Sequence, residues 1–185
     1  MTGMVIFGVA AAAIIIFIIS GYNNGIKLKN YVKEAFATMD VYLKKRWDLI
    51  PNLIETVKGY TEHEKGLLEK LTELRSKNYS TMSDAQKLET NSELTQILSR
   101  FIAVAENYPD LKANQNFLQM SEELSAIETD IANSRKYYNG TVRELNTFLE
   151  VFPTNIIGSM FGFQKEKMFE IAEAERQNVK VSFND

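Results

Sequence analysis

The chain has 185 residues, of which 45% are hydrophobic and 24% charged, enough for one domain with a true core and one appendage. Its formal net charge of -3 comes from 21 basic and 24 acidic residues, so there is no basic excess and we expect no nucleic-acid partner. The sequence contains no cysteine, which excludes disulfides, thiolate metal sites, cysteine nucleophiles and a lipid-modified cysteine.

Residues 1–26 carry no charged side chain and are predicted to form a membrane anchor. The apolar stretch, about residues 3–21, is close to the roughly 20 residues that a helix needs to cross a bilayer. A cleaved signal peptide is the alternative, but it would begin with basic residues and have a shorter apolar core. We therefore expect a retained single-pass helix that contacts membrane lipid through residues 3–21.

Basic residues follow this apolar stretch but do not precede it. Lys27, Lys29 and Lys33 come soon after it, whereas only the amino terminus is basic before it. The positive-inside rule then places the N-terminus outside and the body in the cytoplasm. The predicted location is a bacterial cell membrane.

Small residues at a spacing of four recur in and after the apolar stretch. Gly8 and Ala12 form one such pair, and Gly21 and Gly25 form another. The spacing permits close helix contact, but such pairs are common by chance in a stretch rich in alanine and glycine, so we favour a simple lipid-facing anchor over a specific dimer face.

Residues 27–164 are predicted to form a bundle of long helices. Apolar residues from Leu28 to Val57 recur with a mean period of about 3.6, and a second apolar row runs beside the first. Two rows indicate burial against more than one neighbour. Pro51 should kink this helix or begin a new one, and Asp48 is placed to cap the new segment.

The later helices are predicted in the same way, from apolar periodicity and from the residues that begin or end a helix. A leucine stripe continues to about Lys77, and residues 78–86 then interrupt the helical pattern. Ser83 with Gln86 three residues later is typical of a capping box that opens the next helix, which Pro109 ends.

A polar corner at 107–114 leads to a long helix from about residue 117 to 152, with an apolar period of 3.5. An apolar, glycine-containing loop is predicted for 154–164. The segment 165–185 is predicted to hold a short amphipathic helix, 165–177, and an extended tail. The predicted fold is all-α, an N-terminal transmembrane helix followed by an antiparallel up-and-down bundle of long helices.

Catalytic patterns are absent from the sequence. His63 precedes Glu64, but no second histidine follows one turn later, because the chain has a single histidine. Glu122 and Glu123 are adjacent on a helix and point in different directions. No glycine-rich phosphate loop or nucleophile motif occurs. We expect no enzymatic activity, no metal and no cofactor.

Several charged residues lie on or beside the rows that face the core. A buried charge is costly unless it is paired, and polar residues in a long seam tend to fix register. We hypothesise that Arg46 and Arg135 pair with acids among Asp48, Glu106 and Glu128 in an internal network. The motivating feature is that Arg135 occupies the one break in the apolar pattern of the long helix. An Arg135→Met variant with unchanged melting temperature and packing would contradict this hypothesis.

Four sequence blocks are distinctive in combination: RWDLIPNLIETVKGY (46–60) with HE (63–64), AENYPDLKANQNF (105–117), SRKYYN (134–139) and FPTNIIG (152–158). Together they resemble the LemA family of bacterial membrane proteins. Trp47 stands where tyrosine or phenylalanine is more usual in the family. The resemblance implies a single-pass membrane protein with a cytoplasmic bundle, in a family without established enzymatic activity or defined site residues. It also implies a link to envelope processes, including organelle formation in magnetic bacteria.

Two functions remain open from the sequence. The first is a scaffold that self-associates in membrane organisation, as the double apolar row and the apolar segment 156–163 suggest. The alternative is a membrane-tethered adaptor or sensor that presents the bundle to a protein partner. The native mass of the full-length protein extracted from membrane separates the two.

Overall fold

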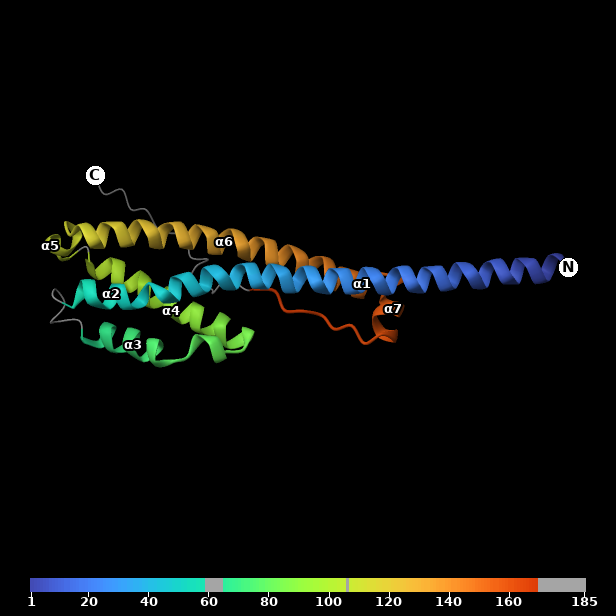
Figure 1. Ribbon diagram of the computed structural model, residues 1–185, viewed down its shortest axis with the longest axis horizontal. Coiled ribbons are helices and arrows are strands. Elements are labelled where there is room, and N and C mark those ends of the chain that lie inside the picture. The colour runs from blue at the N-terminus through green and yellow to red at the C-terminus, as the bar shows by residue number, and fades with distance from the viewer. Residues whose placement is uncertain (59–64, 106, 170–185) are drawn as a thin grey trace, which may run out of the picture. The chain divides into compact units, whose positions relative to one another are not determined.

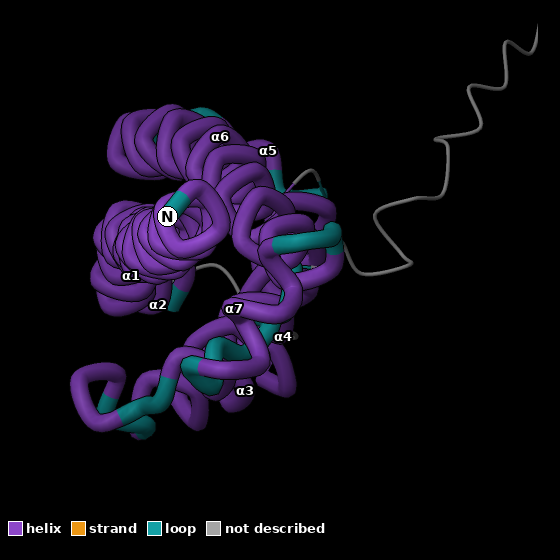
Figure 2. Tube along the Cα trace, turned by 90° about the vertical axis from the view of Figure 1, so that its right-hand side faces the viewer, coloured by secondary structure: helices purple, strands orange, loops and turns teal. Residues whose placement is uncertain are grey.

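The computed structural model describes residues 1–58, 65–105 and 107–169, and all of the regular structure in these ranges is helical (Figure 1). The elements are listed here in chain order: α1 (Thr2–Asp48), α2 (Ile50–Val57), α3 (Lys65–Ser76), a 3-10 turn (Tyr79–Thr81), α4 (Asp84–Ala105), α5 (Pro109–Lys112), α6 (Gln115–Glu150) and α7 (Thr154–Met160). Figure 2 shows only helix and loop in the described part. The predicted all-α class is confirmed.

The chain packs as two compact units. The first unit comprises Met1–Asp40 with Ala132–Met168, and the described part of the second comprises Val41–Ile131 with Phe169. These units group residues by packing, and the segments 1–26, 27–164 and 165–185 stay a prediction. Each unit is described separately below.

In the first unit, α6 runs antiparallel to α1 (Figure 1). The Phe36 ring lies 5.9 Å from the Tyr138 ring, whereas Gly25, earlier on α1, lies against Phe148, later on α6. Residue numbers thus rise along α1 in the direction in which they fall along α6, as in an antiparallel pair. The N-terminal part of α1 is long and apolar enough to cross a membrane, and its most apolar window is 0% buried.

The segment predicted as an apolar loop is instead the short helix α7. The hydroxyl of Thr154 donates to the carbonyl of Phe148 at 2.6 Å, which fixes the turn into the helix. Gly162, at a φ of 68°, ends it, and the N–H of Phe163 returns to the carbonyl of Gly158 at 3.0 Å. Gly158 also permits close packing, since an added Cβ would lie 2.6 Å from the Leu149 Cδ2. Its glycines therefore serve packing and termination, where the sequence suggested an irregular loop.

Residues 165–169 do not form the start of the predicted helix 165–177. Asn146 binds the backbone of Glu166 twice, accepting from its N–H at 3.0 Å and donating to its carbonyl at 2.9 Å. The Tyr138 hydroxyl donates to the carbonyl of Lys167 at 3.1 Å. These bonds to α6 hold an extended backbone in place of helical hydrogen bonds. The rest of that prediction, and the extended tail, lie outside the described residues.

In the second unit, the helical path is interrupted just before Pro51, as predicted. α1 ends at Asp48 and α2 begins at Ile50, with Pro51 in its first turn, where a missing N–H has no cost. The predicted cap by Asp48 is wrong. Leu49 occupies the N-cap position without a side-chain bond, because Asp48 pairs instead with Lys44 one turn earlier on α1.

The remaining connections of the second unit are set by local side-chain caps. Ser83 and Gln86 form the predicted capping box, with the N–H of Ser83 2.9 Å from the Gln86 Oε1 and the N–H of Gln86 3.3 Å from the Ser83 Oγ. The predicted polar corner contains the single-turn helix α5. Asn114 then opens α6 by accepting from the N–H groups of Asn116 and Phe117.

The second unit has a continuous apolar core. The Trp47 ring packs 5.5 Å from Tyr79, and the Phe101 ring lies 6.0 Å from Phe117. Among the fully buried apolar side chains of this unit are Ile50, Leu53, Leu71, Leu74, Leu94, Leu111 and Ile131. Burial of this kind contributes about 1.5–3 kcal/mol per large side chain, which makes it the main stabilising term.

A close approach at Gly25 gives the first testable prediction. A Cβ at Gly25 would lie 2.8 Å from the Phe163 Cζ and 3.2 Å from the Phe148 Cε1, whereas nothing lies within 4 Å of one at Gly8. Gly25→Leu should therefore destabilise the first unit by about 1–3 kcal/mol through overpacking, despite the gain in helix propensity. Gly8→Leu makes the same chemical change without a clash.

Thermal unfolding of the detergent-solubilised full-length protein measures the difference. Gly25→Leu should melt earlier and Gly8→Leu at or above the wild-type temperature. Equal melting of the two variants would contradict the described packing.

Candidate functional site

The last turn of α1 carries a completely buried arginine. Arg46 is 0% exposed, and its Nη1 donates to the Thr95 Oγ1 at 3.0 Å and to the Glu128 Oε1 at 2.5 Å. Its Nη2 donates to the carbonyl of Asn91 at 2.8 Å and to the Asn91 Oδ1. One guanidinium therefore joins α1 to both α4 and α6. We call Arg46, Asn91, Thr95 and Glu128 the Arg46 cluster.

The Arg46 cluster contributes more to the choice of which helix faces pack together than to the free energy of unfolding. A buried guanidinium loses its hydration, and the charge-assisted bonds to its neighbours offset that cost only when their geometry is good. The Glu128 side chain is 39% exposed, so water screens part of the pairing. The Arg46 Nε and the Asn91 Nδ2 are buried without a hydrogen-bond partner. The cluster thus fixes which faces of three helices meet.

Asp48 and Glu128, both predicted as acids for the network, lie in different environments. Glu128 meets Arg46. Asp48 forms an ion pair with Lys44, with the Lys44 Nζ 2.5 Å from the Asp48 Oδ2, and its side chain is 53% exposed. Asp48 is therefore not part of the Arg46 cluster, because a lysine one turn back on the same helix face holds its carboxylate in solvent.

Membership of the two other predicted residues in the network stays a prediction. Glu106 lies outside the described residues. Arg135 is half-buried on the part of α6 that belongs to the first unit. Its role as a register-fixing residue stays a prediction, and the melting behaviour of Arg135→Met remains its test.

Sequence reasoning missed Asn91 and Thr95. Both are short neutral residues one helical turn apart, on the face of α4 that also carries the buried Leu94 and Leu98. A search restricted to charged partners passes over them. A neutral polar residue at a core-facing position was the available signal, since a buried amide there must find a hydrogen-bond partner.

Hydrogen bonds saturate the end of the Arg46 side chain. Four bonds occupy its two terminal nitrogens, which join α1 to its neighbours. In the parts of the chain that the structure describes, no group of three His, Cys, Asp or Glu side chains could hold a metal ion. His63 lies outside those parts. The arrangement clamps helices together.

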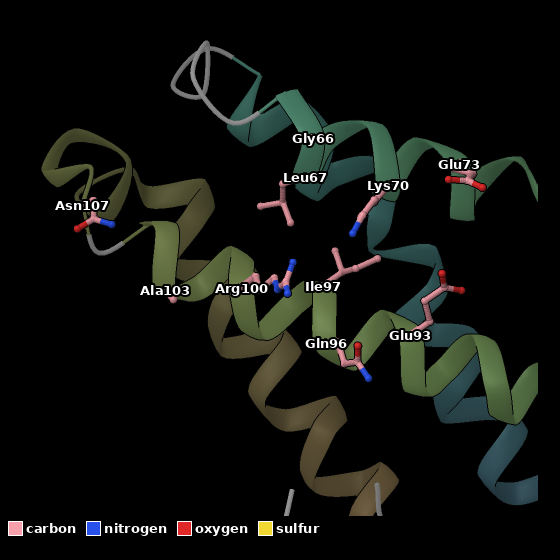
Figure 3. Close-up of a pocket in the computed structure, with 10 residues that line it drawn as sticks. All are labelled: Gly66, Leu67, Lys70, Glu73, Glu93, Gln96, Ile97, Arg100, Ala103 and Asn107. Carbon is pink, nitrogen blue, oxygen red and sulfur yellow. The ribbon is translucent and has the colours of Figure 1, made fainter. Parts of the chain in front are cut away.

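A cavity of about 670 Å³ lies between α3 and α4 (Figure 3). Lys70 of α3 and Arg100 of α4 point toward each other across it, and neither has an ion pair or hydrogen bond within the described ranges. Leu67 and Ile97 supply apolar surface. Two cations beside apolar side chains suit an anionic group carried on an apolar ligand or peptide.

Comparison with known proteins finds a family match for most of the helical body. The model of the LemA family matches residues 35–183, which include every member of the Arg46 cluster. The chain belongs to the LemA family. It is 27% identical to Protein LemA of Metamycoplasma hominis over 180 residues, covering 96% of this chain and 82% of that protein. It is 20% identical to Magnetosome protein MamQ 2 of Paramagnetospirillum magneticum over 193 residues, covering 90% of this chain and 71% of the relative.

Magnetosome protein MamQ 1 of the same organism matches equally well, at 20% identity. The resemblance of the four sequence blocks to the LemA family is therefore confirmed. Together with the apolar part of α1, these matches indicate a membrane-associated helical protein.

The Arg46 cluster gives the second testable prediction. Arg46→Met removes four hydrogen bonds and leaves Glu128 and Asn91 without their donor, so unfolding should become easier by about 3 kcal/mol. Lys44→Met, two residues earlier on the same helix, breaks only the half-exposed pair with Asp48 and should cost less than about 1 kcal/mol.

Chemical denaturation of the two variants in detergent measures both costs. A double variant with Glu128→Gln should lose less than the sum of the single changes, since the two side chains share one interaction. Equal costs for Arg46→Met and Lys44→Met would show that the buried clamp adds nothing specific.

Proposed function

We propose that this LemA-family protein is a single-pass membrane scaffold of a bacterial cell envelope, without enzymatic activity, whose bundle self-associates to organise membrane. The observation that carries the proposal is the continuity of α1. The same helix contains the apolar stretch and then the core-facing Leu43 and Trp47. No linker interrupts α1 between the apolar stretch and these core-facing residues, and a scaffold needs such a direct connection.

The proposed orientation has the N-terminus outside and the bundle in the cytoplasm. Its support is the group of lysines, Lys27, Lys29 and Lys33, directly after the apolar stretch. The relatives named as magnetosome proteins support a role at a specialised cell structure.

Self-association draws on apolar side chains that each unit leaves exposed. The second apolar row of the first long helix is mostly used within the chain, because Ala35, Leu49 and Leu53 are buried. In the second unit, Val41, Ile102 and Leu118 are each about half exposed. These three positions are the contact points that a second copy would use.

The absence of cysteine allows a direct crosslinking test. Val41→Cys, Ile102→Cys and Leu118→Cys are introduced one at a time into the full-length protein, and membranes are treated with a bifunctional maleimide. We expect covalent dimers from at least one of these variants. Ser80→Cys, at an exposed polar position, measures collisions by chance.

Native mass in detergent completes the test. A mass of two or more chains, with dimers above the Ser80→Cys level, supports the scaffold. Monomers in detergent together with crosslinking no higher than that control would overturn it.

The alternative is an adaptor that presents its bundle to a protein partner. The cavity between α3 and α4 favours it. Lys70 and Arg100 have no ion-pair partner among the described residues, and Asn107, in the polar corner at 107–114, also lines the cavity. A partner segment with acidic and apolar side chains would fit this surface.

Charge reversal tests the adaptor. Pull-down from crosslinked membranes should recover a stoichiometric partner. The double variant Lys70→Glu with Arg100→Glu should lose this partner, and so should variants changed at 107–114 or 78–86. Lys136→Glu, an exposed cation of the first unit, serves as the control and should retain the partner. Recovery of the same proteins with all variants would argue against the adaptor.

A further inference from the structure

Helix α7 packs against a short stretch of α1. The Ile157 side chain lies directly on Gly21, where an added Cβ would come within 2.1 Å of the Ile157 Cδ1. The Phe161 ring lies 4.7 Å from the Tyr22 ring, and Phe163 lies against Gly25. The α7 segment, residues 151–163, is therefore fixed beside residues 21–25 of α1.

Residues 21–25 are where the apolar stretch of α1 ends. The first 26 residues carry no charge, and Lys27 is the first charged side chain. A bilayer core of about 30 Å takes roughly 20 helical residues, so an α1 that crosses the membrane must leave the hydrocarbon near this level. Tyr22 has the amphipathic ring typical of that boundary. The α7 segment consequently lies at the depth of the lipid headgroups.

Several apolar side chains of the α7 segment are exposed to solvent. Phe152 is 79% exposed, Met160 57% and Ile156 53%, whereas Ile157, which lies on Gly21, is 1% exposed. None of residues 151–164 carries a charge. A contiguous exposed apolar patch of this kind marks an interaction surface.

Charged residues flank this patch on both sides. Glu150, at the end of α6, and Lys165, after α7, form an ion pair at 2.7 Å. The uncharged α7 segment thus emerges from the protein between two charged residues. An uncharged segment between charged residues suits the boundary between the membrane interface, which accepts apolar side chains, and water, which holds the charges.

We propose that the α7 segment is a second membrane contact, which inserts Phe152, Ile156 and Met160 into the headgroup region of the bilayer that α1 crosses. The proposal rests on the proposed anchoring by α1. The occupant is lipid, because the depth of α7 is set by α1 itself and because the segment lacks the charges that a polar partner surface would need. Two contacts would prevent the first unit from tilting freely about its anchor.

Fluorescence quenching in vesicles tests the contact. Single cysteines replace Met160, Ile19 or Tyr137 in the full-length protein, each is labelled with an environment-sensitive dye, and the protein is reconstituted with phosphatidylcholine and phosphatidylglycerol. Shallow nitroxide-labelled lipid is the quencher. Ile19 lies in the apolar stretch. Tyr137 is 52% exposed and is the neighbour in sequence of Tyr138, whose ring packs on Phe36, roughly 22 Å along α1 from Gly21.

We expect about twofold or greater quenching at Met160→Cys and Ile19→Cys, and little at Tyr137→Cys, which lies beyond the headgroups. Quenching at Ile19→Cys without quenching at Met160→Cys overturns the second contact and leaves the anchor standing. No quenching at Ile19→Cys overturns the anchor itself.

Two further outcomes complete the test. A blue-shifted Met160→Cys dye that lipid does not quench would mean that protein, such as a second copy, covers α7, and would overturn the lipid contact. Ile156→Cys repeats the measurement one helical turn away, so a local effect of one substitution does not decide the outcome.

Discussion

Helix α1 has to satisfy two different surroundings without a break, and the rest of the structure depends on that constraint. Its first half is apolar around the whole circumference, as lipid requires, and its second half has buried and exposed faces, as a bundle requires. The change occurs at residues 20–25, SGYNNG, which are poor helix formers that each cost about 0.5–1 kcal/mol relative to alanine. Tertiary contacts must offset that cost.

The contacts at this weak stretch come from α7. Gly21 and Gly25 are poor for the helix but permit Ile157 and Phe163 to approach its backbone, and both glycines are buried. Burial of Ile157 contributes about 1.5–3 kcal/mol, and the partly buried Phe163 adds to it, which offsets the loss of helix propensity at the two glycines. The residues that weaken α1 locally are thus the residues that let another segment brace it. The Arg46 cluster does comparable work at the other end of α1, where it fixes the register with α4 and α6.

Much of this fold is predictable from the apolar periodicity and from the proline and capping residues that begin and end helices. The restart at Pro51, the capping box at Ser83 and the length of α6 all follow from local rules that tertiary packing does not override. The α7 segment was not predictable, because its helix depends on packing against α1 and its glycines resemble loop residues. The Arg46 cluster was half predictable. The charges of Arg46 and Glu128 indicated that they would pair. The contact of Arg46 with the neutral Asn91 and the pairing of Asp48 with Lys44 depend on how each helix is rotated about its axis, which no single stretch of sequence specifies.

Hydrogen exchange of the full-length protein in vesicles tests the continuity of α1 most directly. If α1 is one braced helix, backbone amides of residues 22–32 should be protected to the same degree as those of residues 36–43, which include the buried Met39 and Leu43. Rapid exchange confined to residues 20–27, with protection on both sides, would reveal a hinge between anchor and bundle. That result would contradict the unbroken α1 helix on which the proposed scaffold role depends.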